Sequence, residues 1–510
     1  MGGGNSMDLE SIEKAVKRLS LLGVFANIET DGKDVIFNLE KVTRQINTLV
    51  IPFGVTKLDF RYLPEIIEEL PASKVKREDS LEDGVGDSGI SIKYVKDWEQ
   101  KTVEVKTKHR KTGYLKYEIK HLKLPDTMIE IEKETFRNIG GIEEVTLGKE
   151  CRKIGKRAFL NSKQLKRIHM PDSLDCIEEA TFKNSGLVAF KVPRALKAIG
   201  YCVFEGCDKL RDISLQEGLE KIEVGAFSGC SELNKVSIPK TCKHIEDGAF
   251  GFCINLTEIS LPDGIETIGQ ACFTDNGIKK IELPKRLKTL GDSAFSQCRS
   301  LVELDIPDSV TELGGEMFME CMKLKRVKLP NNLKEVPRQL FEGSNLEEIE
   351  LPNSIEKIEA AAFRVCKELR KLKIPESCIE IEEDAFVESG IEEIIIPDSV
   401  QKLGNDICFR CKNLKKAEIG ASVNKIMRGS FEGCVNLEEV ILSEGCKEIG
   451  NYTFNGCEKL KKIRIPSTMT KIAARSFLHT QIESLVVPES CIVDGKQIAE
   501  KGKEIKIIRA

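Results

Sequence analysis

A phenylalanine recurs every 22 or 23 residues along most of the chain, always within the same order of apolar and polar positions. Residues 301–324 show one copy, L-V-E-L-D-I-P-D-S-V-T-E-L-G-G-E-M-F-M-E-C-M-K-L. A period of this length is typical of stacked repeat proteins, in which each coil buries its apolar residues against its neighbours. We therefore predict a repeat solenoid. The recurring residues are Phe136, Phe159, Phe182, Phe204, Phe227, Phe250, Phe273, Phe295, Phe318, Phe341, Phe363, Phe386, Phe409, Phe431, Phe454 and Phe477.

Within each copy, the phrase L-x-x-I-x-I-P predicts a short β-strand. In residues 460–466 the leucine and both isoleucines point to one side, whereas Lys462 and Arg464 point to the other, as the two-residue period of a strand requires. The proline that follows ends the strand, because it has no N–H for a further ladder hydrogen bond. A second apolar trio, such as Val310, Leu313 and Phe318, completes the coil, and a glycine at or near the next corner suits a turn.

These phrases resemble the BspA-type (Treponema-type) leucine-rich repeats, whose pattern reads approximately L-x-x-I-x-I-P-x-x-V-x-x-I-G-x-x-A-F-x-x-C. The segments I-G-Q-A-C-F, I-E-D-G-A-F-G-F-C, L-G-D-S-A-F-S-Q-C and I-E-A-A-A-F-R-V-C are similar to it, and about seventeen copies lie between Ile119 and Val487. The resemblance implies a leucine-rich-repeat horseshoe, with a parallel β-sheet on the concave face and turns or short helical segments on the convex face. It also implies a recognition protein, since many family members are bacterial or protist surface proteins that bind host molecules.

Length and charge agree with a solenoid and narrow the function. A chain of 510 residues exceeds the size at which one compact core stops growing, but a stack of coils avoids that limit. The net charge of −4, from 78 basic and 82 acidic residues, gives no bias towards nucleic acid or an anionic membrane. No run of 18 apolar residues predicts a membrane-spanning helix, and the first residues lack the features of a secretory signal.

These features favour a cytoplasmic location. The start M-G-G-G-N-S also fits an N-myristoylation pattern, in which a lipid on Gly2 would tether the chain to a membrane. The alternatives are therefore a membrane-associated or cell-surface protein, or a native start at Met7 that leaves no such anchor.

The eighteen cysteines follow the repeat. Eight cysteines lie three residues after a repeat phenylalanine, and four other cysteines lie eight residues before one. Both are core positions, where cysteine acts as a small apolar side chain. We therefore expect reduced, buried thiols.

The ends of the chain depart from the repeat, and we divide it into four regions. Residues 1–60 combine a helix at 8–22, which would cap the stack, with one early repeat at 46–58. Residues 61–117 form an island with two or three strands and a mobile loop at 74–90, which is polar and rich in glycine. The solenoid follows at 118–487. Residues 488–510, with a short polar helix, form a C-terminal cap.

Catalytic and metal-binding motifs are weak. The GxGxxG phrase at 84–89 has no strand before it and no helix after it, so it does not predict a nucleotide site. The CxxC phrase of Cys408 and Cys411 lies inside a repeat, without the second pair or nearby histidine that zinc would need. His121 and His169 face solvent two coils apart, which indicates surface polarity rather than a metal pair. We expect no enzyme activity, no cofactor and no metal.

The solvent-facing strand residues differ along the chain. From Glu303 to Glu393 their charge alternates from coil to coil, which predicts lateral ion pairs rather than a ligand site. Earlier coils carry small or uncharged residues instead, and small residues on a concave wall leave room for a partner. The candidate binding residues are Thr146, His169, Ser214, Ser237 and Ser260.

Two classes of function remain. The first is a non-catalytic scaffold that binds a protein partner on the concave face, either inside the cell or as a surface adhesin for host ligands. The second is a sensor or enzyme whose chemistry lies in residues 1–118, with the solenoid recognising a target. The absence of a catalytic motif favours the scaffold.

Overall fold

The computed structural model describes residues 120–494 and 505–510, together with the backbone of six earlier strands. The chain divides into two units, residues 1–244 with 252–256 and residues 245–251 with 257–510. In both units parallel strands join successive coils, and the coils form a β-solenoid of about 16 turns. The six earlier strands are β1 (Val24–Thr30), β2 (Val35–Val42), β3 (Thr48–Val50), β4 (Lys57–Asp59), β5 (Gly89–Lys93) and β6 (Thr102–Lys106).

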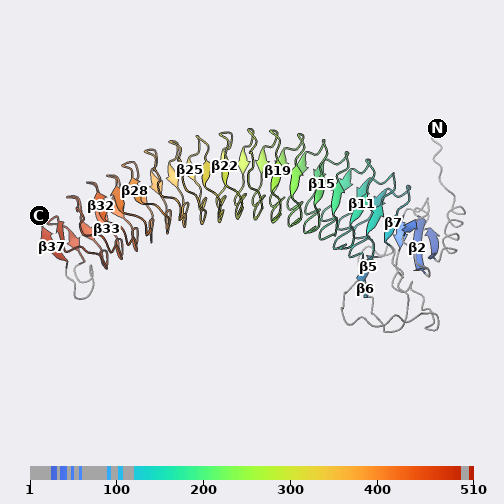
Figure 1. The fold of residues 1–510 in the computed structure, drawn as a ribbon, viewed down its shortest axis with the longest axis horizontal. Coiled ribbons are helices and arrows are strands. Elements are labelled where there is room, and N and C mark those ends of the chain that lie inside the picture. The colour runs from blue at the N-terminus through green and yellow to red at the C-terminus, as the bar shows by residue number, and fades with distance from the viewer. Residues whose placement is uncertain are drawn as a thin grey trace. The chain divides into compact units, whose positions relative to one another are not determined.

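The phrase L-x-x-I-x-I-P forms the longer strands of the solenoid in most coils, and Figure 1 labels some of them. The copies at 278–284, 346–352, 369–375 and 460–466 form at most an isolated β-bridge, so the strand predicted at 460–466 is reduced to one bridge at Arg464. The longer strands alternate as expected: in β17 Val236 is buried, while Lys235 and Ser237 are exposed. We call the exposed side of these strands the sheet face. In the first unit they are β7 (His121–Lys123), β9 (Glu144–Thr146), β11 (Arg167–His169), β13 (Ala189–Lys191), β15 (Asp212–Ser214) and β17 (Lys235–Ser237). In the second unit they are β19 (Glu258–Ser260), β22 (Glu303–Asp305), β24 (Arg326–Lys328), β28 (Glu393–Ile396), β30 (Lys416–Ile419), β32 (Glu439–Leu442), β35 (Ser484–Val487) and β37 (Lys506–Arg509).

A second row of two-residue strands follows the longer ones. Each strand ends on the second apolar position of the repeat, for example Ile154, which pairs in register with Ile131 and Ile177. Where short helical segments were expected, the described residues contain only these strands and turns, and no helix. In the first unit the row comprises β8 (Glu130–Ile131), β10 (Lys153–Ile154), β12 (Cys176–Ile177), β14 (Ala198–Ile199) and β16 (Lys221–Ile222), followed by β18 (His244–Ile245). In the second unit it comprises β20 (Thr267–Ile268), β21 (Thr289–Leu290), β23 (Glu312–Leu313), β25 (Glu335–Val336), β26 (Lys357–Ile358), β27 (Glu380–Ile381), β29 (Lys402–Leu403), β31 (Lys425–Ile426), β33 (Glu448–Ile449), β34 (Lys471–Ile472) and β36 (Ile492–Val493).

Backbone hydrogen bonds also join the coils through the turn that carries each phenylalanine. The N–H groups of Glu134, Phe136 and Asn138 donate to carbonyls of the next coil at 2.9, 2.8 and 2.7 Å. The residues two before and two after the phenylalanine have positive φ, as Glu134 (58°) and Asn138 (57°) show. This conformation favours glycine or asparagine, and both residue types recur at the position two residues after the phenylalanine.

The recurring phenylalanines form a buried column in each unit. Fifteen of the sixteen are at most 1% exposed. Neighbouring rings stack nearly parallel, with centroids from 5.1 Å apart, between Phe136 and Phe159, to 6.3 Å apart, between Phe295 and Phe318. This is the range in which offset aromatic pairs attract one another beyond simple burial.

The prediction that Phe409 belongs to this column is wrong. The N–H of Phe386 bonds to the carbonyl of Ile407, and the N–H of Cys408 bonds to that of Ser430, which aligns Cys408 with the phenylalanines. Cys408 is fully buried. Phe409 is only half-buried, and the guanidinium carbon of Arg410 lies 4.8 Å from its ring centroid. A thiol therefore replaces a ring at this coil.

The cysteines three positions after the column residue donate hydrogen bonds in addition to filling space. Sγ of Cys321 lies 3.1 Å from the carbonyl oxygen of Phe295, one coil earlier, and Cys298 makes the same bond to Phe273. Other donors take this position in other coils: Oγ of Ser162 donates to the carbonyl of Phe136 at 3.0 Å. The position thus requires a small donor that satisfies a buried carbonyl.

All eighteen cysteines are free, and all but the half-buried Cys176 are buried. Burial raises the pKa of the Cys207 thiol to about 12 and that of Cys321 well above its ordinary value. Both thiols therefore stay protonated at neutral pH, as hydrogen-bond donation requires.

Strands outside the regular repeat bear on the proposed domain boundaries. β3, within the early repeat at 46–58, pairs in parallel with β7, and β5 and β6 form an antiparallel pair within the island at 61–117. Near the C-terminus, β37 pairs in parallel with β35. The expected helix at 8–22, nearly all of the loop at 74–90 and the polar stretch at 495–504 lie outside the described residues. The four regions remain predictions.

We predict that Phe295→Ala destabilises the protein by about 3–5 kcal/mol, because it empties a fully buried site between two stacked rings. Phe409→Ala is the matched control and should cost clearly less, because its ring lies outside the column. Urea unfolding of both variants measures the difference. Equal losses would mean that Phe409 occupies a column position after all.

The donor role of the cysteines predicts a difference between two substitutions of similar size. Cys321→Ala should be less stable than Cys321→Ser by about 1–3 kcal/mol, because only serine can still donate to the carbonyl of Phe295. Denaturant midpoints of the two variants provide the comparison. A serine variant no more stable than the alanine variant would show that cysteine serves only as apolar filling.

Thiol titration under denaturing, non-reducing conditions should recover all eighteen cysteines from freshly purified protein. Recovery of only a few would indicate disulfides between neighbouring coils.

Candidate functional site

The five candidate binding residues all lie on the longer strands. Thr146 and His169 are register partners on β9 and β11. Ser214 and Ser237 are exposed at the ends of the neighbouring strands β15 and β17. Ser260 is exposed on β19, which belongs to the second unit. The structure thus brings together two pairs within the first unit.

A depression of about 640 Å³ lies on the sheet face of the first unit. We call it the β11–β17 depression. It exists because the short side chains of Ala189, Ser214 and Ser237 lie among longer ones. His169 also lines it, whereas Thr146 does not. Its charged lining residues are Arg167, Lys191, Arg211, Lys235 and Asp212.

Beside the depression, one carboxylate is shared by two histidines. Nδ1 of His121 lies 3.0 Å from one oxygen of Glu144, and Nε2 of His169 lies 2.5 Å from the other. The hydrogen bond with His169 holds the pKa of Glu144 below its ordinary value. From the sequence we expected the two histidines to contribute surface polarity rather than a metal pair, and the carboxylate that they share was not predicted.

Two cations of the depression have no acidic partner. Among the described residues, no carboxylate lies within 4.0 Å of the side-chain nitrogens of Arg167 or Lys191, both of which are exposed. Arg211 differs, because its Nε lies 2.9 Å from Glu232. The depression therefore carries positive charge that the protein itself does not neutralise.

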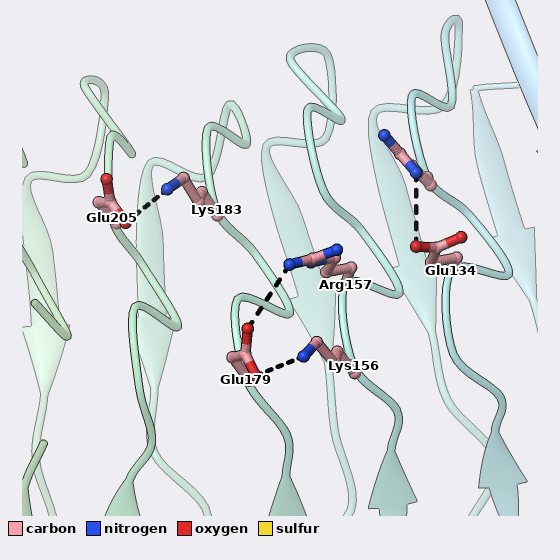
Figure 2. A network of polar contacts seen from close by, with 7 residues as sticks. Glu134, Lys156, Arg157, Glu179, Lys183 and Glu205 are labelled. Atoms are coloured by element: carbon pink, nitrogen blue, oxygen red, sulfur yellow. Dashed lines mark hydrogen bonds and ion pairs between the residues drawn. The ribbon is translucent and has the colours of Figure 1, made fainter. Parts of the chain in front are cut away.

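Several charges on the turns of neighbouring coils are paired, as Figure 2 shows. Lys156 and Arg157 approach the two oxygens of Glu179 at 2.6 and 3.6 Å, and Lys183 approaches Glu205 at 2.7 Å. These exposed pairs contribute little stability, but they neutralise one another.

The ladder predicted between Glu303 and Glu393 forms only at its two ends. Arg326 lies 3.1 Å from Glu303, and Lys416 lies 3.5 Å from Glu393. The bond with Glu303 raises the pKa of Arg326. Lys371 and Lys373 between them make no ion pair within 4.0 Å among the described residues, although acidic residues line the same surface.

The described residues include no group of three or more histidine, cysteine, aspartate or glutamate side chains that could hold a metal ion. They also include no helix long and apolar enough to cross a membrane.

Three solved structures illustrate what the chain is similar to. A leucine-rich repeat protein from Bacteroides ovatus shares 19% identity, with 95% of this chain and 98% of that chain covered and a TM-score of 0.47. A leucine-rich cell surface protein from Faecalibacterium prausnitzii shares 19%, with 82% and 95% covered and a TM-score of 0.37. The pneumococcal vaccine antigen PcpA shares 18%, with 96% and 97% covered and a TM-score of 0.36. No curated protein matches the chain.

A match to a family sequence model assigns the chain to its family. The model of the BspA type leucine rich repeat region, which comprises six copies, matches residues 110–230, 177–302, 288–415 and 390–500. These matches overlap and together span the solenoid, including the strands that form the β11–β17 depression. The chain therefore belongs to the BspA-type leucine-rich repeat family.

Proposed function

We propose that this chain is a non-catalytic scaffold that binds a protein partner on the sheet face. The observation that carries the proposal is the β11–β17 depression, a hollow lined by hydroxyl groups on strands that the coil stack holds in register. Ser214, Ser237 and His169 would contact the partner there, with Thr146 at one margin. Ser260, which is exposed on β19 in the second unit, stays a separate candidate residue.

The proposal is supported physically because the binding surface would be preformed. Phe190 on β13 and Val236 on β17 face inward and are buried, at 4% and 1% exposure, which anchors these strands before a ligand binds. One tryptophan and six tyrosines in the whole chain favour modest affinity, because those residues dominate many binding hot spots.

The alternatives differ in their support. A sensor or enzyme function in residues 1–118 depends on side chains outside the described residues, and no observation favours it. A surface adhesin is also a binding scaffold and is an equally good form of this proposal. The cytoplasmic location expected from the sequence gains no support from the family, and a lipid on Gly2 likewise stays an expectation.

The test fills the depression without changing its charge. The partner would be captured on the wild-type chain from the native host, identified by mass spectrometry, purified and titrated. We predict that Ser214→Gln combined with Ser237→Gln weakens binding by at least about tenfold, because longer side chains occupy the contact volume. Thermal stability should hardly change, since both residues are exposed.

The matched control is Ala421→Gln with Ser422→Gln, which enlarges two exposed residues away from the sheet face. It should bind as the wild type does. Ser260→Gln alone tests the candidate residue of the second unit. If the Ser214 and Ser237 variant binds as tightly as the control, the sheet face of the first unit is not the binding site.

A further inference from the structure

We propose that the β11–β17 depression binds an extended, carboxylate-rich segment of the protein partner, with Arg167 and Lys191 supplying the attraction. This inference rests on the proposed function and adds the chemistry of the partner. Neither residue is among the candidates that the repeat pattern selects. Their role follows from how the charges of neighbouring coils are distributed.

Among the described residues Arg167 has no acidic partner, because the carboxylate of its register neighbour contacts other side chains. Its register partner on β9 is Glu144, the position from which a lateral ion pair would be expected. Both oxygens of Glu144 are instead held by His121 and His169, at 3.0 and 2.5 Å. The guanidinium of Arg167 is therefore left exposed at the rim of the depression, with its donors available for a carboxylate.

Lys191 is uncompensated for a different reason. Its register partner on β15 is Ser214, which carries no charge. The one carboxylate that lines the depression is Asp212, against four basic side chains. Arg211 is neutralised by Glu232, and Lys235 is also engaged in an interaction, which leaves Arg167 and Lys191 as the cations that a ligand can reach without breaking an existing contact.

The shape of the depression favours an extended segment as the ligand. Ala189, Ser214 and Ser237 are too short to obstruct a chain laid across the strands. Nε2 of Gln216 donates to Oγ of Ser214 at 2.8 Å, which leaves the hydroxyl hydrogen of Ser214 free to donate to a ligand oxygen. Carboxylates next to arginine and lysine form the stronger, charge-assisted hydrogen bonds. The protein as a whole has a net charge of −4, so attraction of an acidic ligand must be local.

The experiment titrates the full chain with a fluorescent twelve-residue peptide of alternating glutamate and serine. Its comparison ligands are the lysine–serine counterpart and a single-stranded oligonucleotide. The glutamate–serine peptide should bind tightest, and binding should weaken as salt rises, because exposed charges are screened. Arg167→Gln with Lys191→Gln should weaken binding by about tenfold, the effect expected of two exposed charge contacts. Arg167→Lys with Lys191→Arg should retain binding.

Lys371→Gln with Lys373→Gln is the matched control. It removes the same charge from a stretch of the sheet face where Glu348, Glu350 and Glu393 lie on the same surface, so peptide affinity should stay at the wild-type level. All three variants alter exposed side chains without ion pairs, and their melting temperatures should match that of the wild type.

Three results would overturn the inference. They are unchanged binding by the Arg167 and Lys191 variant, an equal loss in the control, and tighter binding of the oligonucleotide, which would indicate a general polyanion site. The natural partner separates this inference from the proposed function. If filling the depression at Ser214 and Ser237 abolishes partner binding but neutralising Arg167 and Lys191 does not, the scaffold function stands and the acidic-segment inference fails.

Discussion

Every coil of this chain depends on hydrogen bonds that it makes to the coil beside it. A coil of 22 or 23 residues pairs some of its backbone groups in its own turns, and many of the others are satisfied across the stack in the longer strands, in the two-residue strands and in the phenylalanine turns. The buried carbonyls of the phenylalanines receive an additional donor from a cysteine, serine or asparagine side chain. This requirement fixes the register, and the register determines which residues share the sheet face.

The binding surface follows from that constraint. Because the strands are locked in register, a sequence change in one coil alters a row of side chains rather than an isolated point. Glu144 illustrates this, since it accepts contacts from the coil before it and the coil after it. Where a charge has no complement on the adjacent coil, as with Lys191 opposite Ser214, the surface keeps a charge that a partner can use.

The sequence was sufficient for the fold because the period is visible in the residues themselves. The alternation around Val236 and the proline after it predict a strand from local chemistry, and β17 forms there, whereas the same phrase around Ile463 leaves only an isolated bridge at Arg464. Phe409 was misplaced because spacing alone cannot distinguish residue 408 from residue 409. The cysteine at 411, three positions after the true column residue, was the better guide. The shared carboxylate of Glu144 could not be predicted, because the side chains involved lie on three coils and each has several possible partners. Short helical segments were also expected. The turns instead contain residues of positive φ, which bend the backbone more tightly than a helix does.

Cys408 interrupts what is otherwise an aromatic stack in the second unit. Rings follow one another up to Phe386 and again from Phe431, but the coil between them contributes a thiol. In a repeat protein, stability is the sum of each coil's own contribution and its two interfaces, so weaker interfaces divide the chain into segments that open separately. The substitution of sulfur for a ring thus sets a boundary of cooperativity: the C-terminal coils can fray as a group while those before Phe386 remain closed.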